Sequence, residues 1–289
     1  MSIFRECGDE IEKQIRPKTV PFVVKMLKKK EDIPKKAMRP KRDFGRLLDV
    51  CQAFALARRD GLEVALLKED IWCPEPVIGY GFAEPPKWFL EGHMWFPWAY
   101  ETLEAGANLA ASLPRFKSGQ YVGIVSAPYK VADFEPDLLI VYGNASQMKR
   151  LIDGARYRDG YGIGACLHGR CAAFGNGACV RAVVPAIQTG RSQITLPCGG
   201  DHKYAIAQDD ELIFTVPKKE MEDLIKGLKR TAELGISTYP YKFTMMLEHE
   251  LHDTYLELRK ILEMTERLGE TPKEESWYRG SYKRKKRTE

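Results

Sequence analysis

Two segments of this chain carry the same order of features, and this repetition constrains the fold more than anything else in the sequence. The first reads CQAFALARRDGLEVALLKEDIWCPEP and the second reads CVRAVVPAIQTGRSQITLPCGGDH. Each opens with a Cys on an Ala/Val-rich helical stretch that a Gly ends, followed by a β-rich strand and a second Cys in a Pro or Gly turn. Equivalent landmarks are separated by 128 residues (Cys51 and Cys179), 129 residues (Gly61 and Gly190) and 125 residues (Cys73 and Cys198). An offset that holds at three landmarks predicts duplication of one structural unit.

The alternation of helical and β-rich stretches predicts an α/β or α+β fold with mixed sheets. Residues 1–135 are expected to form the first half of a duplicated domain, and residues 136–240 the second half. Residues 241–270 are expected to form a long C-terminal helix, and residues 271–289 a basic, disordered tail. Strands are expected at 21–27, 62–67, 121–126, 137–142, 192–196 and 212–216, and helices at 44–59, at 100–113 and from residue 217 onward.

The first half contains an apolar, Pro- and aromatic-rich insertion that begins at Pro74 and runs through Pro97. It contains Trp88 and Trp95, and Trp98 follows directly. Long irregular segments of this kind are often lids, binding loops or subunit contacts, so Trp95 is a candidate wall for a bound ligand. Simple core or dimer packing is an equally good interpretation of the same residues.

Cysteine usage points to reduced thiols. The N-terminal sequence has no apolar signal core, so the seven Cys are expected to remain reduced in a cytoplasmic protein, where metal binding or catalysis is favoured over disulfides. If the halves pack about a pseudo-twofold axis, Cys51, Cys73, Cys179 and Cys198 meet near it and become candidate ligands for an iron–sulfur cluster or zinc. Alternatives are buried Cys that act as small hydrophobic residues, and reactive thiols at helix N-termini.

Two further motifs contain candidate site residues. The turn CGGDHKYA places Cys198, Asp201 and His202 close together after a strand, which suggests a catalytic role, although a turn function explains Asp201 equally well. The Gly-rich passage before the second helix could hold a phosphate or carboxylate on free backbone N–H groups, with arginines adding charge. Its candidate residues are Gly175, Gly177, Arg170 and Arg181. Cys166 and Cys171 lie in the same passage, with no assigned role.

Charge and hydropathy exclude some classes of protein. Five basic side chains between Gly280 and Glu289 account for most of the net charge of +5, so the body of the chain is nearly neutral, which argues against nucleic-acid binding. No apolar run approaches the ~20 residues of a membrane span. The helical stripe within Phe243–Leu268 suggests a homo-oligomer.

The stretches PDLLIVYGNASQMKRLIDGARY and ITLPCGGDHKYAIAQDDELIFTVP resemble the uncharacterised family numbered 169 among the domains of unknown function. The resemblance covers roughly Pro21 to Arg230. It implies a prokaryotic, cytoplasmic protein, common among anaerobes and archaea, and brings no established reaction. The chain departs from the family pattern in its Trp-rich insertion, in Cys166 and Cys171, and in its C-terminal extension.

The leading hypothesis from the sequence is a cysteine-rich metal or iron–sulfur site between two pseudo-symmetric halves, suited to redox or lyase/hydratase chemistry on a small organic acid. One alternative is a metal-free protein that binds a small organic acid or aromatic molecule, or a reactive-thiol enzyme. Another alternative is a structural subunit of a larger complex. An enzyme or enzyme subunit is favoured, with the reaction open.

Overall fold

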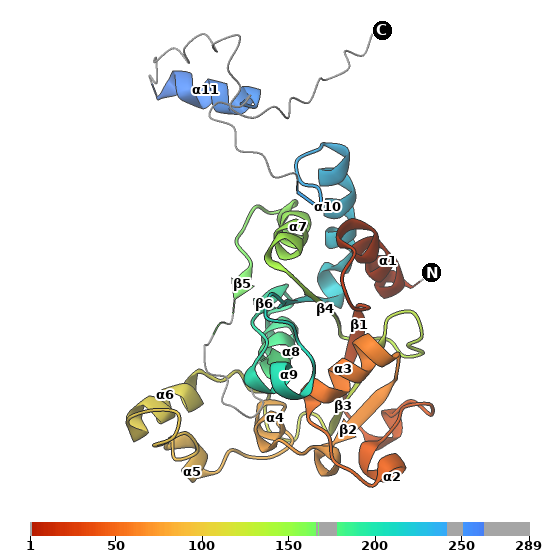
Figure 1. The fold of residues 1–289 in the computed structure, drawn as a ribbon, viewed down its shortest axis with the longest axis vertical. Coiled ribbons are helices and arrows are strands. Elements are labelled where there is room, and N and C mark those ends of the chain that lie inside the picture. Colours follow the sequence, from red (N-terminus) through yellow and green to blue (C-terminus); the bar gives the residue numbers. More distant parts are fainter. Residues whose placement is uncertain (1, 166, 168–177, 242–250, 263–289) are drawn as a thin grey trace. The chain divides into compact units, whose positions relative to one another are not determined.

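The computed structural model describes residues 2–165, 167, 178–241 and 251–262. The chain divides into two units, residues 1–240 and 241–289, and each is described by itself. The first unit is built on one seven-stranded mixed sheet with helices on both faces (Figure 1). The mixed α/β class expected from the sequence is confirmed.

The strands follow the expected hydrophobic runs closely. Each of the four strands β1 to β4 is buried along nearly its whole length, as near-continuous apolar runs predict for strands covered on both faces. The strands are β1 (Phe22–Leu27), β2 (Val64–Leu67), β3 (Gly123–Pro128), β4 (Leu138–Gly143), β5 (Gly164–Ala165), β6 (Gln193–Thr195) and β7 (Leu212–Pro217).

The strand order is β2-β3-β1-β4-β7-β6-β5. The central pair is β1 with β4, antiparallel, in the register Phe22 opposite Ile140 and Val24 opposite Leu138. On one side β3 and then β2 follow, and on the other side β7 and then β6 follow, all antiparallel. Only the short β5 pairs in parallel among the described strands. The sheet therefore has the same antiparallel arrangement on both sides of its central pair.

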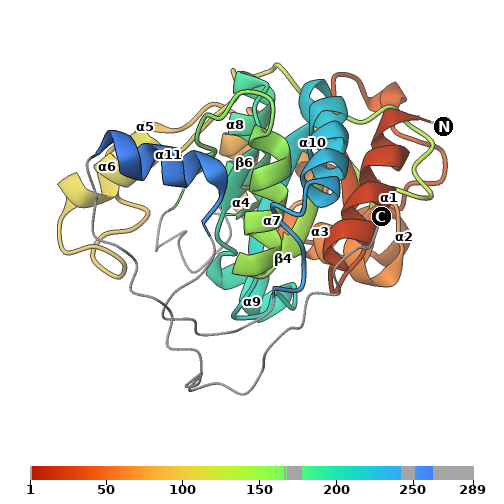
Figure 2. The same cartoon turned by 90° about the horizontal axis from the view of Figure 1, so that it is seen from above.

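Two helical layers cover the sheet. On one face lie α3 (Val50–Asp60) and α8 (Ala178–Thr189) with the short helices α4 (Pro74–Gly79) and α9 (Gly199–Tyr204). On the other face α1 (Ile3–Ile15), α7 (Ala145–Arg156) and α10 (Met221–Glu233) lie side by side, as Figures 1 and 2 both show. Alternate residues of β1 divide between these layers: Phe22 and Val24 face α3, whereas Val23 faces the α1 layer.

Local sequence explains where α3 begins and ends. Asp49 and Gln52 form a capping box at its N-terminus, and Gly61 ends it in the left-handed region at φ 76°. Gly190 has φ 64° directly after α8, so both of the helices opened by a Cys stop at a left-handed Gly. These two residues are the Gly stops expected from the sequence.

The Trp-rich insertion forms a small core together with the helix that follows it. α5 (Lys87–Leu90), inside the insertion, packs against α6 (Leu103–Ser112), which lies after it. Trp95 is fully buried there beside Phe89, with ring centroids 4.9 Å apart, whereas Trp88 and Trp98 are about half exposed. This placement accords with the packing interpretation of Trp95, and its role as a ligand wall stays a prediction.

The second unit is described only at α11 (Asp253–Ile261), which is shorter than the helix expected over 241–270. His252 caps its N-terminus, so Leu251 and His252 lie before the helix. Residues 242–250 and 263–289, including the basic tail, lie outside the described residues. Self-association through this part of the chain stays a prediction.

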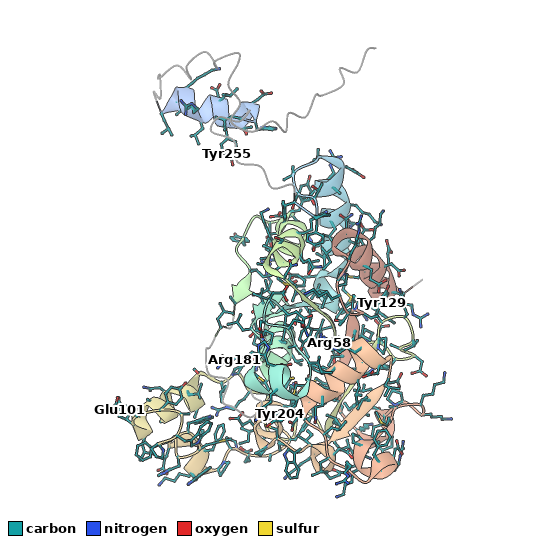
Figure 3. All side chains as sticks on the ribbon, viewed as in Figure 1. Arg58, Glu101, Tyr129, Arg181, Tyr204 and Tyr255 are labelled. Atoms are coloured by element: carbon teal, nitrogen blue, oxygen red, sulfur yellow. The ribbon has the colours of Figure 1, made fainter. Side chains whose placement is uncertain are left out.

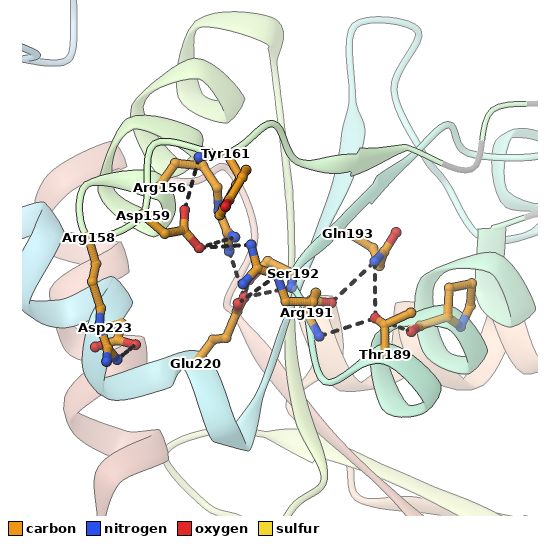
Figure 4. A network of polar contacts seen from close by, with 11 residues as sticks. Arg156, Arg158, Asp159, Tyr161, Thr189, Arg191, Ser192, Gln193, Glu220 and Asp223 are labelled. Carbon is orange, nitrogen blue, oxygen red and sulfur yellow. Dashed lines mark hydrogen bonds and ion pairs between the residues drawn. The ribbon is translucent and has the colours of Figure 1, made fainter.

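A cluster of ion pairs joins the end of α7 to the start of β6 and of α10 (Figure 4). Glu220 accepts hydrogen bonds at 2.7 Å from Arg156, from the backbone N–H of Ser192 and from its hydroxyl group. Asp159 pairs with Arg156 and with Arg191. The carboxylates and guanidinium groups satisfy one another, so this network holds the elements together.

α7 and α10 cross at two glycines. A Cβ atom on Gly227 would collide with the backbone carbonyl of Gly154, and a Cβ on Gly154 would lie 2.7 Å from the side chain of Leu228. The two helix backbones therefore approach to a distance that only a residue without a Cβ allows.

We expect Gly227→Ala to lower the free energy of unfolding by about 1–3 kcal/mol, because the added methyl group meets backbone rather than a flexible side chain. Gly162→Ala is the matched control, since a Cβ there meets no atom within 4 Å, and its change should stay within about 0.5 kcal/mol. Urea denaturation of both variants measures the difference. Equal stability of the two variants would contradict the close crossing.

Candidate functional site

The four cysteines singled out in the sequence lie at the N-termini of four helices on one face of the sheet. Cys51 and Cys179 are the second residues of α3 and α8, and Cys73 and Cys198 are the N-caps of α4 and α9. α3 contacts both α8 and α9, and α8 also contacts α4. All four thiols are buried and none is in a disulfide.

Cys51 is the common neighbour within this thiol cluster, which we define as Cys51, Cys73, Cys179 and Cys198. The thiol of Cys179 interacts with that of Cys51, and this interaction contributes to the raised pKa of Cys179. Cys51 also interacts electrostatically with Cys73 and with Cys198. These interactions link Cys51 to thiols from two distant parts of the chain, and the meeting of all four as one ligand set stays a prediction.

Two aspartates fasten the helix ends that carry the thiols. Oδ1 of Asp49, the N-cap of α3, accepts a hydrogen bond at 2.9 Å from the backbone N–H of Cys73. In α9, Oδ2 of Asp201 accepts from the backbone N–H of Cys198 at 3.1 Å, and the Cys198 sulfur accepts from the backbone N–H of Asp201 at 3.4 Å. Each carboxylate thus sets the position of a cysteine backbone.

A chain of polar and aromatic contacts leads from the thiol cluster along α3. The hydroxyl of Tyr142, on β4, donates to Oδ1 of Asp201 at 3.0 Å. The guanidinium of Arg58 lies 4.0 Å from the centre of the Tyr142 ring, within the range of a cation–π interaction. Arg58 is 2% exposed and donates to Thr19 and to the carbonyl of Ala205 (Figure 3 labels Arg58).

Burial controls the ionisation of these groups. It is the main cause that raises the pKa of Cys73, of Cys179 and of Cys198, and nearby carboxylates add to it: Glu75 at Cys73 and Asp201 at the other two. Burial also raises the pKa of Asp201 itself. A helix N-terminus contributes roughly 0.3–1 kcal/mol to an anion, whereas burial of a thiolate costs more, so these thiols are protonated at neutral pH. The reactive thiolates suggested by the helix N-termini are therefore not favoured in this state.

Within the residues that the structure describes, no three His, Cys, Asp or Glu side chains are grouped so that they could hold a metal ion. The described thiols therefore do not form a preassembled ligand set. Cys166, His168 and Cys171 lie outside the described residues.

The other predicted site residues lie in different surroundings. His202 is exposed, and its Nδ1 lies 3.1 Å from the carbonyl of Ala207, while Cys198 and Asp201 face the core. Arg181 is buried on α8, 3% exposed (Figure 3). The predicted residues Gly175, Gly177 and Arg170 lie outside the described part of the chain.

Sequence reasoning missed Asp49, Arg58, Tyr80 and Tyr142. Tyr80 is fully buried and interacts electrostatically with Cys179, Cys51 and Asp201. No local motif marks either tyrosine. Asp49 had a signal in the sequence, because Asp49 and Gln52, three residues later, form a capping-box pattern at the start of a helix.

The profile of the family described as Uncharacterised ArCR, number 169 among the domains of unknown function, matches residues 10–227. The chain belongs to this family. An uncharacterised protein of Methanocaldococcus jannaschii is 24% identical over 216 residues, which cover 72% of this chain and 87% of the relative. No solved structure matches the chain significantly. A search of the described helices finds none that is long and apolar enough to cross a membrane.

The raised thiol pKa values predict that stability falls in alkali. An unfolded thiol ionises near pH 8.5, whereas Cys198 in the folded protein keeps its proton to higher pH, so the unfolded state binds fewer protons above pH 8.5. Each such thiol should lower the free energy of unfolding by up to about 1.4 kcal/mol per pH unit there.

Urea denaturation at pH 7, 8.5 and 10 tests this for the wild type, for Cys198→Ala and for Val183→Ala, a buried control that cannot ionise. Cys198→Ala should flatten the alkaline loss of stability, whereas Val183→Ala should shift the whole curve without changing its slope. Parallel curves for all three proteins would show that Cys198 ionises freely within the fold.

Proposed function

We propose that the thiol cluster is the functional centre of this member of the ArCR family and that it binds a thiophilic metal, as an iron–sulfur cluster or as zinc. The observation that carries the proposal is that four buried cysteines lie at helix N-termini on one face of the sheet, where Cys73, Cys179 and Cys198 each interact electrostatically with Cys51. These four cysteines come from parts of the chain that only the tertiary fold brings together.

Electrostatics supports a metal more than a free thiolate. A metal thiolate centre carries negative charge, and the positive ends of α3, α4, α8 and α9 surround the thiols. Binding would replace the thiol protons, so the affinity should rise with pH. Deprotonation and a rearrangement of the side chains would convert the four thiols into ligands.

We further propose that the two sides of the first unit arose by duplication. The support is the repeated order of a Cys near a helix start, a left-handed Gly, a strand and a Cys at an N-cap, together with the matching strand order on both sides of β1 and β4. In that arrangement Cys51 corresponds to Cys179, and Cys73 to Cys198. A shared centre between the two repeats is then suited to redox or dehydration chemistry on a small organic acid.

The test is the metal and acid-labile sulfide content of protein purified without oxygen, with its visible spectrum. Wild type should contain iron with sulfide, or zinc, at near-stoichiometric amounts, and each single Ala variant of the thiol cluster should lose most of it. Cys7→Ala is the matched control, because Cys7 is also fully buried but lies in the core on the other face of the sheet.

Metal retained in all four cluster variants would contradict the proposal, as would a wild type that takes up neither zinc nor iron and sulfide after anaerobic reconstitution. Loss of metal in Cys7→Ala as well as in the cluster variants would point to general instability. Comparison of the thermal midpoints of the apo proteins separates these cases.

A further inference from the structure

The C-terminal end of α3 borders a hollow of about 440 Å³, away from the thiols. Its walls come from the connection between α1 and β1 and from the last turn of α3. The lining residues are Glu12, Arg16, Pro17, Lys18, Thr19, Val20, Arg58 and Arg59. Four of these residues are cationic and only one is acidic, and the volume lies within the range of small-molecule sites, about 300–1,000 Å³.

Two of the four cations already have carboxylate partners. Lys18 pairs with Asp210 at 3.2 Å, and Arg58 lies 3.5 Å from Glu211. The acidic residue of the hollow, Glu12, pairs with Lys130 outside it at 2.6 Å. The uncompensated positive charge of the hollow is therefore that of Arg16 and Arg59.

Of the four cations that line the hollow, Arg16 and Arg59 have no ion pair with a carboxylate among the described residues. Arg59 donates to the carbonyl of Ile206 at 2.6 Å. Burial and the neighbouring charge of Arg58 lower the pKa of Arg59, so an anion would relieve an unfavourable interaction. The hollow also lies at the C-terminal ends of α1 and α3, whose dipoles contribute about half a negative charge each. The two positive charges of Arg16 and Arg59 exceed the negative charge of about one that the two helix ends contribute together.

The backbone at this hollow is held in a conformation that L-residues rarely adopt. Within the described residues, the non-glycine positions with positive φ are Arg16, at 47°, and Ile206, at 57°, and Ile206 is the residue that accepts from Arg59. The side-chain amide of Gln147 donates to the carbonyls of Ile15 and Arg16 at 2.8 and 3.2 Å, which fixes the strained turn. A Gly would suit the C-cap of α1 better, so the arginine there occupies a conformation against its local preference.

We propose that this hollow is a binding site for a small oxyanion, a carboxylate or phosphate compound, held by the guanidinium groups of Arg16 and Arg59 with Lys18 at the rim. Guanidinium groups match the paired oxygens of both anion types. α3 has 11 residues and is about 16 Å long, so the site is separated from the thiol cluster by the length of the helix. The proposal therefore does not depend on metal binding.

The test is isothermal titration of the full chain at low ionic strength with two probes, citrate and inorganic phosphate. We expect wild type to bind at least one, and the binding to weaken as sodium chloride is raised, because the contacts are charged. Stronger binding of citrate identifies a carboxylate ligand, and stronger binding of phosphate identifies a phosphate compound. Failure to bind either probe overturns the proposal.

Arg16→Gly separates binding from folding, because Gly accepts φ 47° without strain and should leave the thermal midpoint unchanged or higher. It should weaken binding at least ~10-fold, as should Arg59→Gln. The matched control is Arg230→Gln on α10, whose exposed side chain pairs with Glu233 and does not line the hollow, and it should change the affinity less than about two-fold. Equal affinities for Arg16→Gly and Arg230→Gln would overturn the site and leave Arg16 as a helix cap alone.

Discussion

The antiparallel pairing of β1 with β4 is the contact on which the rest of the first unit depends. It joins the strand at residues 22–27 to the strand at 138–143, and it is buried on both faces. Because every other long strand is added outward from this pair in antiparallel register, its position also sets where α3 and α8 cross the sheet. The helices lie over the same face, and their Cys-bearing ends meet there.

Burial and helix ends act in opposite directions at the thiol cluster. Four helix N-termini favour negative charge, but the apolar core and the nearby carboxylates disfavour it, and burial is the larger effect. Cys73, Cys179 and Cys198 therefore rest as protonated thiols. The same arrangement can accept a metal thiolate centre, since a cation would remove the cost of burying uncompensated thiolates.

α3 connects the two candidate sites of this protein. Its first turn contains Cys51, and its last turn contains Arg58, which contacts the Tyr142 ring and backs the basic hollow. Tyr142 in turn donates to Asp201 beside Cys198. Arg58 is thus a buried structural cation shared by both ends of the helix, whereas Arg16 and Arg59 keep charge available at the surface.

The sequence alone was enough to determine the local structure of this protein and to indicate which cysteines matter. Apolar runs marked each long strand and Gly61 marked the end of α3, because strand burial and helix termination depend on neighbours in the chain. The start of this helix was expected at residue 44, whereas α3 begins at Val50 after the N-cap Asp49. The strand order, the interaction of Cys179 with Cys51 and the Tyr142 to Asp201 contact were decided by the tertiary structure. Tyr142 and Asp201 lie 59 positions apart, and no local pattern encodes which of the buried side chains will face each other. Ionisation was decided there too, because a helix start at Cys179 favours the thiolate, but only the assembled core shows that burial outweighs it.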